Sequence, residues 1–199
     1  MLRIIGKASS INVRKVLWTC AETGRSYERE EWQDSFARLN PNAMAPVIVD
    51  DGFVLWESNT ICRYLCAQGQ GSVLLGTDAR QRARVEQWMD WQATELNNAW
   101  RYAFMALVRN SPAHTDATQV AASVGNWNRH VGMLEAQLCS TGQFVTGEHF
   151  TLADVVLGLS VNRWLMTPME RPDYPALRSW FERLGERPGF LEHGRNGTP

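Results

Sequence analysis

The feature that most constrains the fold of this chain is a proline-led hairpin followed by a helix, within residues 39–61. Pro46 stands directly before two β-rich runs that flank the turn dipeptide Asp51-Gly52, and this pattern predicts a β-hairpin over residues 47–55. An apolar periodic stretch then predicts a helix over residues 58–67.

Four residues of this segment could together hold an extended peptide. Pro46 ahead of a strand leaves the backbone N–H and C=O of Val47 free to pair with such a peptide. The first N–H groups of a helix bind carboxylates readily, and Ser58 begins a helix directly after Glu57. The combination indicates a pocket for a small acidic peptide.

The residues before the hairpin complete a thioredoxin-like pattern. A strand is predicted over residues 2–5, and a helix with one apolar stripe follows and ends near Gly24. A second strand is predicted over residues 27–32. The resulting order is β-α-β, a loop, and then β-β-α, which is the thioredoxin-like arrangement.

A glycine-rich stretch predicts a division of the chain into two domains. Residues 71–77 are expected to link an α/β thioredoxin-like domain of residues 1–70 to an all-α domain of residues 78–199. Beyond the linker, apolar residues recur only at helical spacing. The expected helices cover residues 79–109, the region 120–138, the region from 152 onward and residues 175–187.

The residues before the third of these helices strongly predict where it begins. Thr151 is a candidate N-cap with Asp154 at the N3 position, and Phe150 and Val155 occupy the positions of a hydrophobic staple. The residues that follow are apolar nearly all round, so this helix is expected to be central and buried.

Composition excludes several functions. The 199 residues carry a net charge of −1 without a basic stripe, which argues against a nucleic-acid partner. No apolar run is long enough for a signal peptide or a membrane span, so a cytoplasmic protein is expected. The four histidines lack ligand spacing, so no metal is expected. All four cysteines are expected to be reduced and buried: Cys20, Cys62, Cys66 and Cys139.

Two serines before the first helix could serve chemistry or structure. Ser9 or Ser10 could simply cap the helix. Alternatively, a hydroxyl donor at a helix N-terminus favours a bound thiolate, the reactive form of a thiol. Asn12 could add an amide donor to the same sulfur.

These segments resemble the cytosolic glutathione transferases, and Ser10-Ile11-Asn12 resembles the Ser-x-Asn motif of their serine-type, theta- or nu-like bacterial members. The resemblance implies a glutathione transferase fold, with Ser10 and Asn12 at the thiol. It implies a cis bond before Pro46, backbone pairing of Val47 with the cysteinyl part of glutathione, and binding of the γ-glutamyl end by Glu57 and Ser58.

The resemblance leaves alternatives open within the family. The isomerases of the zeta type carry a Ser-Ser-Cys run here, which would give Ser9 the active role, but this chain lacks the cysteine. The absence of a cysteine at residues 9–12 also argues against the omega and beta types. Met44 stands where many members have a polar residue that holds the glycine carboxylate. Either Trp32, Gln33 or Arg38 replaces that contact, or the glycyl end is bound more loosely.

The resemblance predicts a homodimeric enzyme that joins the glutathione thiolate to a small hydrophobic electrophile, with glutathione as co-substrate. The electrophile is expected between the domains, against walls formed by Ile11, Trp100, Arg101, Phe104 and Met105. Two rival functions are a glutathione-dependent disulfide reductase and a non-enzymatic interaction protein on the same fold.

Overall fold

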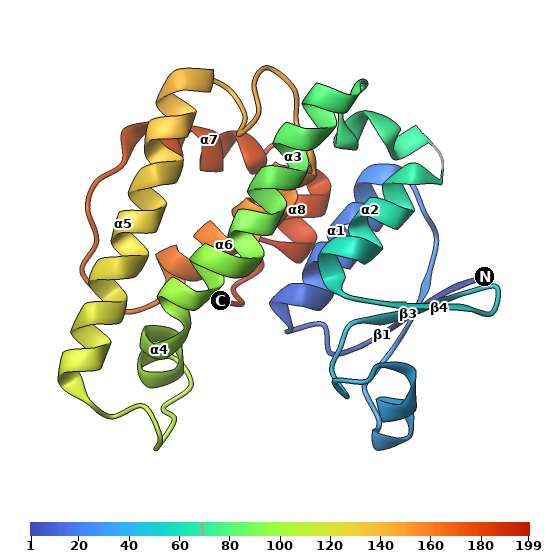
Figure 1. Ribbon diagram of the computed structural model, residues 1–199, viewed down its shortest axis with the longest axis horizontal. Coiled ribbons are helices and arrows are strands. Elements are labelled where there is room, and N and C mark those ends of the chain that lie inside the picture. The colour runs from blue at the N-terminus through green and yellow to red at the C-terminus, as the bar shows by residue number, and fades with distance from the viewer. Residues whose placement is uncertain (69) are drawn as a thin grey trace.

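A small mixed sheet with two helices forms the first part of the fold, and helices alone form the second (Figure 1). The computed structural model describes residues 1–68 and 70–199. The strands β1 (Leu2–Ile5), β2 (Glu28–Glu30), β3 (Val47–Asp50) and β4 (Phe53–Trp56) lie in the order β2-β1-β3-β4. β1 and β2 are parallel, and the other two pairs are antiparallel. The predicted thioredoxin-like arrangement is therefore confirmed.

Two turn signals in this part behave as predicted, and one strand is shorter than predicted. Asp51 and Gly52 both have positive φ, 48° and 89°, as a tight hairpin between β3 and β4 requires. Gly24 ends α1 (Ile11–Thr23) in the left-handed region. β2 covers only half of the six predicted residues, because pairing with β1 stops at Glu30.

The helix α1 corrects the prediction of a single apolar stripe. Its residues Ile11 and Val13 to Cys20 are all buried, because α1 lies between the sheet and the helical part, beside α2 (Ser58–Ala67) (Figure 1). Arg14 and Lys15 are 0% and 2% exposed. Periodicity alone did not indicate that two cations would be enclosed with the apolar residues.

The second part contains the predicted helices with two differences. α3 (Ala79–Trp91) and α4 (Asn97–Leu107) cover most of the predicted helix 79–109, but the π-helical turn η3 (Gln92–Leu96) joins them. α5 (Ala117–Thr141), α6 (Leu152–Met166) and α7 (Pro175–Leu184) follow the predictions. The short helix α8 (Pro188–His193) was not predicted.

Two short 3-10 helices complete the chain, η1 (Asp34–Leu39) and η2 (Gln70–Leu75). η2 overlaps the predicted linker, where Leu74 and Leu75 are buried in the core. One cysteine prediction is wrong: Cys20, Cys62 and Cys66 are buried and free, but Cys139 is exposed near the end of α5.

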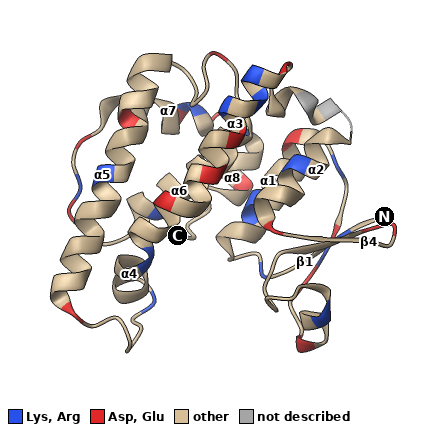
Figure 2. Cartoon of the chain, viewed as in Figure 1, with Lys and Arg blue, Asp and Glu red and all other residues tan. Residues whose placement is uncertain are grey.

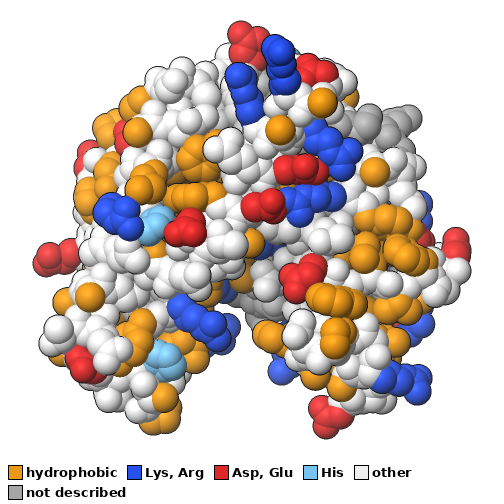
Figure 3. Space-filling view, viewed as in Figure 1, with side chains coloured by type: hydrophobic (Ala, Val, Ile, Leu, Met, Phe, Trp, Pro, Cys, Tyr) orange, Lys and Arg blue, Asp and Glu red, His pale blue; other side chains and the backbone are white. Residues whose placement is uncertain are grey.

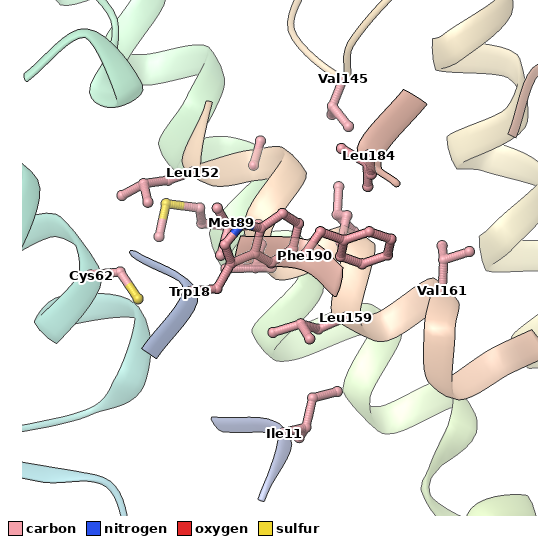
Figure 4. Packing of buried hydrophobic residues seen from close by; sticks show 14 of the residues in the cluster. Ile11, Trp18, Cys62, Met89, Val145, Leu152, Leu159, Val161, Leu184 and Phe190 are labelled. Atoms are coloured by element: carbon pink, nitrogen blue, oxygen red, sulfur yellow. The ribbon is translucent and has the colours of Figure 1, made fainter. Parts of the chain in front are cut away.

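The indole of Trp18 joins the two parts of the core (Figure 4). Its ring centroid lies 5.7 Å from that of Phe150 and 4.9 Å from that of Phe190 in α8. A Cβ at Gly158 of α6 would lie 3.2 Å from the ring, and one at Gly189 would lie 2.7 Å from it. Two glycines therefore provide the space into which α1 inserts its largest side chain.

Asp154 confirms the predicted capping box and extends it. Its carboxylate accepts hydrogen bonds from the N–H groups of Thr151 and Val145, each at 2.9 Å, and from Nε1 of Trp180 at 2.8 Å. The side chain is fully buried. It therefore connects the start of α6 with the preceding loop and with α7.

Replacing Asp154→Ala should lower the free energy of unfolding by about 3 kcal/mol, because several buried donors would lose their acceptor. Urea denaturation measures this loss. Asp116→Ala is the control, since Asp116 caps α5 at an exposed site by accepting from Thr118 and Gln119. It should cost only about 1 kcal/mol. Equal losses in the two variants would contradict the central role of Asp154.

The ammonium group of Lys15 connects three helical segments and, within residues 1–68 and 70–199, forms no ion pair with a carboxylate. Its Nζ donates to Oδ1 of Asn59 in α2 at 3.2 Å and to Oε1 of Gln92 in η3 at 2.8 Å. Nδ2 of Asn59 in turn donates to the carbonyl of Met89 in α3 at 2.9 Å. Burial lowers the pKa of Lys15 to about 8, because desolvation disfavours the charged form.

This lowered pKa predicts a pH-dependent stability. In the unfolded chain the pKa of the lysine is about 10.4. At pH values well below 8 the lysine is charged in both states, so the folded state carries the full free-energy penalty of a buried charge. The penalty disappears as the pH rises from the folded pKa toward the unfolded one. The free energy of unfolding of the wild type, relative to Lys15→Met, should therefore rise by about 2 kcal/mol between pH 8 and pH 10.

Urea denaturation of both proteins at several pH values measures this difference. Lys7→Met is the matched control, because Lys7 is exposed and should give a flat difference over the same range. A flat difference for Lys15→Met as well would show that Lys15 has an ordinary pKa in the folded state.

Candidate functional site

Three segments that the sequence analysis singled out meet at one edge of the sheet. Val47, the first residue of β3, pairs with Ile5, the last residue of β1, and with Trp56, the last residue of β4. The turn into α1, the loop before β3 and the start of α2 therefore leave the sheet at the same edge (Figure 1).

Gly6 brings the first two of these segments into contact. Its φ of 150° belongs to the region that favours glycine. A Cβ at this position would lie 2.5 Å from Cγ2 of Val13 and 2.9 Å from Cβ of Ala45. The first turn of α1 and the residue before Pro46 thus approach the same glycine.

Ser10 occupies the N-cap position of α1, but its hydroxyl makes no capping hydrogen bond. Its backbone supplies the local contacts instead: its N–H donates to the carbonyl of Lys7 at 3.0 Å, and its carbonyl accepts from Arg14 at 2.9 Å. Ser10 and Asn12 are both half-buried, whereas Ser9 is exposed. The hydroxyl of Ser10 therefore remains available to a ligand at the start of a helix.

The loop before β3 has the predicted backbone form. The bond between Ala45 and Pro46 is cis, as the resemblance implied. Pro46 and Val47 are buried, and Val47 is 0% exposed, so the pairing of its backbone with a ligand stays a prediction.

Asn40 holds this loop and was missed in the sequence analysis. Its Nδ2 donates to the carbonyl of Met44 at 2.7 Å, and its Oδ1 accepts from the N–H of Asn42 at 2.9 Å. The second contact closes a local turn that asparagine favours. The pair Asn40-Pro41 was the available signal, since it is typical of such turns.

Glu57 and Ser58 lie at the start of α2, where the backbone is strained. Glu57 has φ 72° and ψ 108°, which is unusual for a residue with a side chain, and such outliers concentrate at ligand sites. Its carboxylate is exposed, while Ser58 is 7% exposed. The first N–H groups of α2, which have no partner within the helix, lie at this same end of α2.

Met44 offers no polar group to this site, and its side chain is 63% exposed. Of the residues predicted to replace the missing contact, Gln33 and Arg38 are exposed around η1 and Trp32 is half-buried, with its ring 6.4 Å from that of Phe36. Their role toward a ligand stays a prediction.

Lys and Arg residues lie on elements that border the space between the two parts, and Asp and Glu residues lie there as well (Figure 2). Arg14 and Lys15 of α1 and Arg163 of α6 are all buried. Burial lowers the pKa of Arg163, and the cations Arg14 and Arg109 lower it further. Together with the N-termini of α1 and α2, these groups favour anionic ligands.

The predicted wall of a second binding region is present in part. The rings of Trp100 and Phe104 in α4 lie 5.4 Å apart, and Phe104 is buried with Ile11. Met105 is half-buried and Arg101 is exposed. Figure 3 shows the surface hollowed between the sheet-containing part and the lower ends of α4 and α5, with Lys and Arg side chains at its walls.

Residues 1–68 and 70–199 contain no candidate metal site, because no group of three or more His, Cys, Asp or Glu side chains there could hold a metal ion. Within the same residues, no helix combines the length and the apolar character that crossing a membrane needs.

Comparisons with known proteins agree with this arrangement. The model of the glutathione S-transferase N-terminal domain matches residues 9–68, and that of the C-terminal domain matches residues 96–188. The glutathione S-transferase GstB of Escherichia coli strain K12 is 35% identical, over 94% of this chain and 95% of its own length. The glutathione S-transferase D7 of Anopheles gambiae is 32% identical, over 86% of this chain and 78% of its own.

A solved structure is also similar along the whole chain. The theta class glutathione S-transferase from Xanthomonas axonopodis pv. citri, crystallised with glutathione bound, superimposes with a TM-score of 0.91. It is 32% identical and covers 100% of this chain and 99% of its own. The two domain models, the full-length relatives and the fold together show that this chain belongs to the glutathione S-transferase family.

Proposed function

We propose that this protein is a glutathione transferase that joins the thiolate of glutathione to an electrophilic carbon of a small compound. The observation that carries this proposal is the uncommitted hydroxyl of Ser10 at the N-terminus of α1. It lies at the same sheet edge as Pro46, Val47, Glu57 and Ser58. The relatives named as glutathione S-transferases support the reaction class.

Glutathione would lie across this edge in an extended form. The backbone of Val47 would pair with its cysteinyl part, which would direct the sulfur toward Ser10 and Asn12. Ser58 and the first N–H groups of α2 would hold the γ-glutamyl carboxylate, and Glu57 would hold the ammonium group beside it. The Xanthomonas relative was crystallised with glutathione bound, which supports glutathione as the ligand.

The protein would lower the pKa of the bound thiol by stabilising its anion. A hydrogen bond from Ser10, the N-terminus of α1 and the buried cation Lys15 all favour the thiolate. Each unit of lowering corresponds to about 1.4 kcal/mol, which one charge-assisted hydrogen bond can supply. The thiolate then attacks an electrophile held against Trp100 and Phe104, so proximity supplies the remaining acceleration.

The family supports two further proposals. The protein would form a homodimer, and it would act in the cytoplasm.

Ser10→Ala should raise the pH midpoint of thiolate formation by bound glutathione by about one unit, because the thiolate loses one hydrogen-bond donor. The ultraviolet absorbance of the thiolate, followed during a pH titration, measures the midpoint. Ser9→Ala is the matched control and should leave it unchanged. A shift in Ser9→Ala alone would transfer the role to Ser9.

Ser58→Ala should weaken the binding of reduced glutathione about tenfold, because the γ-glutamyl carboxylate loses a donor. Calorimetric titration measures the affinity, and Ser26→Ala, at an exposed loop serine, is the control. Unchanged affinity in Ser58→Ala would contradict this placement. A wild-type preference for glutathione disulfide would favour the disulfide reductase, and binding of neither form would favour the interaction protein.

A further inference from the structure

Arg163 is a buried guanidinium that forms no ion pair with the residues that the structure describes. The side chain is 4% exposed, and its Nε is buried with no hydrogen-bond partner among the described residues. The charged groups that act on it most strongly are two other cations, Arg14 and Arg109. A buried charge without a counter-charge is costly for the folded state, so its presence calls for an explanation.

Aromatic contacts hold this guanidinium in one place. Its Cζ lies 4.6 Å from the ring centroid of Trp100 and 4.1 Å from that of Phe104. Contacts of a cation with ring faces fix its position but leave its N–H groups unused. The terminal Nη groups, which no carboxylate meets in the part of the chain that the structure describes, are thus presented beside the aromatic wall.

The Nη groups of Arg14, in contrast, already have hydrogen-bond acceptors. Its Nη1 donates to the carbonyl of Thr198 at 2.8 Å, and its Nη2 donates to that of Pro199 at 3.0 Å. The carbonyls of these two residues therefore accept the hydrogen bonds of this second buried guanidinium. Both Nη groups of Arg14 thus have acceptors, although its Nε, like that of Arg163, has none among the described residues.

The position of Arg163 connects it with the proposed reaction site. Ile11 follows Ser10 at the start of α1, and in Figure 4 its side chain points toward α6 near Leu159. Arg163 is four residues beyond Leu159, so it lies one turn farther along the same face of α6. Figure 3 shows a hollow between the two parts of the fold.

Resting on the proposed function, we propose that the electrophile carries a carboxylate, which Arg163 binds while the half-buried Trp100 holds the body of the molecule. A planar guanidinium fits a carboxylate with two parallel hydrogen bonds. Arg163 would then determine specificity for small anionic electrophiles over neutral ones. The reaction itself is unchanged: for an aryl chloride, the sulfur–carbon bond forms, the carbon–chlorine bond breaks, and chloride leaves with the electron pair.

Binding of unreactive probes tests the anion site without turnover. Calorimetry compares 3-nitrobenzoate with 3-nitrobenzamide, which have the same ring and nearly the same size. The wild type should bind the anion roughly tenfold more tightly. Arg163→Met should abolish this preference and Arg163→Lys should retain part of it. Arg80→Gln, the same loss of charge at the far end of α3, should leave it intact.

The melting temperature of Arg163→Met distinguishes an anion-binding role of Arg163 from a role in packing. An arginine kept for packing would lower the melting temperature when replaced, whereas an unpaired cation should leave it unchanged or raise it in Arg163→Met. Equal wild-type affinity for the two probes, or a preference that persists in Arg163→Met, would overturn the proposal.

Two further experiments make two distinctions. The first shows whether Arg163 binds a carboxylate of the electrophile or one of glutathione, and the second tests the anion site separately from the transferase activity. Saturating glutathione should leave nitrobenzoate binding in place, whereas competition would assign Arg163 to a carboxylate of glutathione itself and overturn the proposal. Turnover is then compared for 4-chloro-3-nitrobenzoate and its primary amide. Anion-selective binding without turnover of either would defeat the transferase proposal alone. Turnover of the amide without anion selectivity would defeat the anion proposal alone.

Discussion

The burial of α1 on all sides is the constraint on which the rest of this structure depends. The helix packs against the sheet and α2 on one side and against α6 and α8 on the other, so both parts of the fold share one core. Trp18 fixes this contact because it fills the space that Gly158 and Gly189 leave open. Any shift of α1 would therefore require rearrangement of both parts.

This enclosure also sets the chemistry of the site. The N-terminus of α1 presents Ser10 at the sheet edge, and a helix held by packing along its length presents that hydroxyl in a defined position. The same enclosure places Lys15 inside the protein, where polar but neutral partners, Asn59 and Gln92, accept hydrogen bonds from its ammonium group. Because its hydrogen-bond acceptors among the described residues are neutral amides, its charge can act on an anion bound nearby.

The π-helical turn η3 belongs to the same arrangement. It interrupts an otherwise continuous helix at the point where Gln92 meets Lys15, and π turns concentrate at functional positions. The turn separates α3, which contacts α2 through Asn59, from α4, which carries Trp100 and Phe104. Lys15 thus connects α2 with the turn that joins α3 and α4.

The sequence by itself determined those features whose signals are local. The Asp51-Gly52 turn, the Gly24 helix end and the capping box of Thr151 and Asp154 each depend on a few adjacent residues, and each was predicted. The order of strands and helices followed from them, and contiguous motifs also identified the candidate residues from Ser10 to Ser58. Only the tertiary structure decided which polar residues are enclosed and which are left unpaired. Lys15 and Arg163 are ordinary charged helix residues in the sequence, and they become unusual because segments far apart in the chain exclude water around them without supplying an anion.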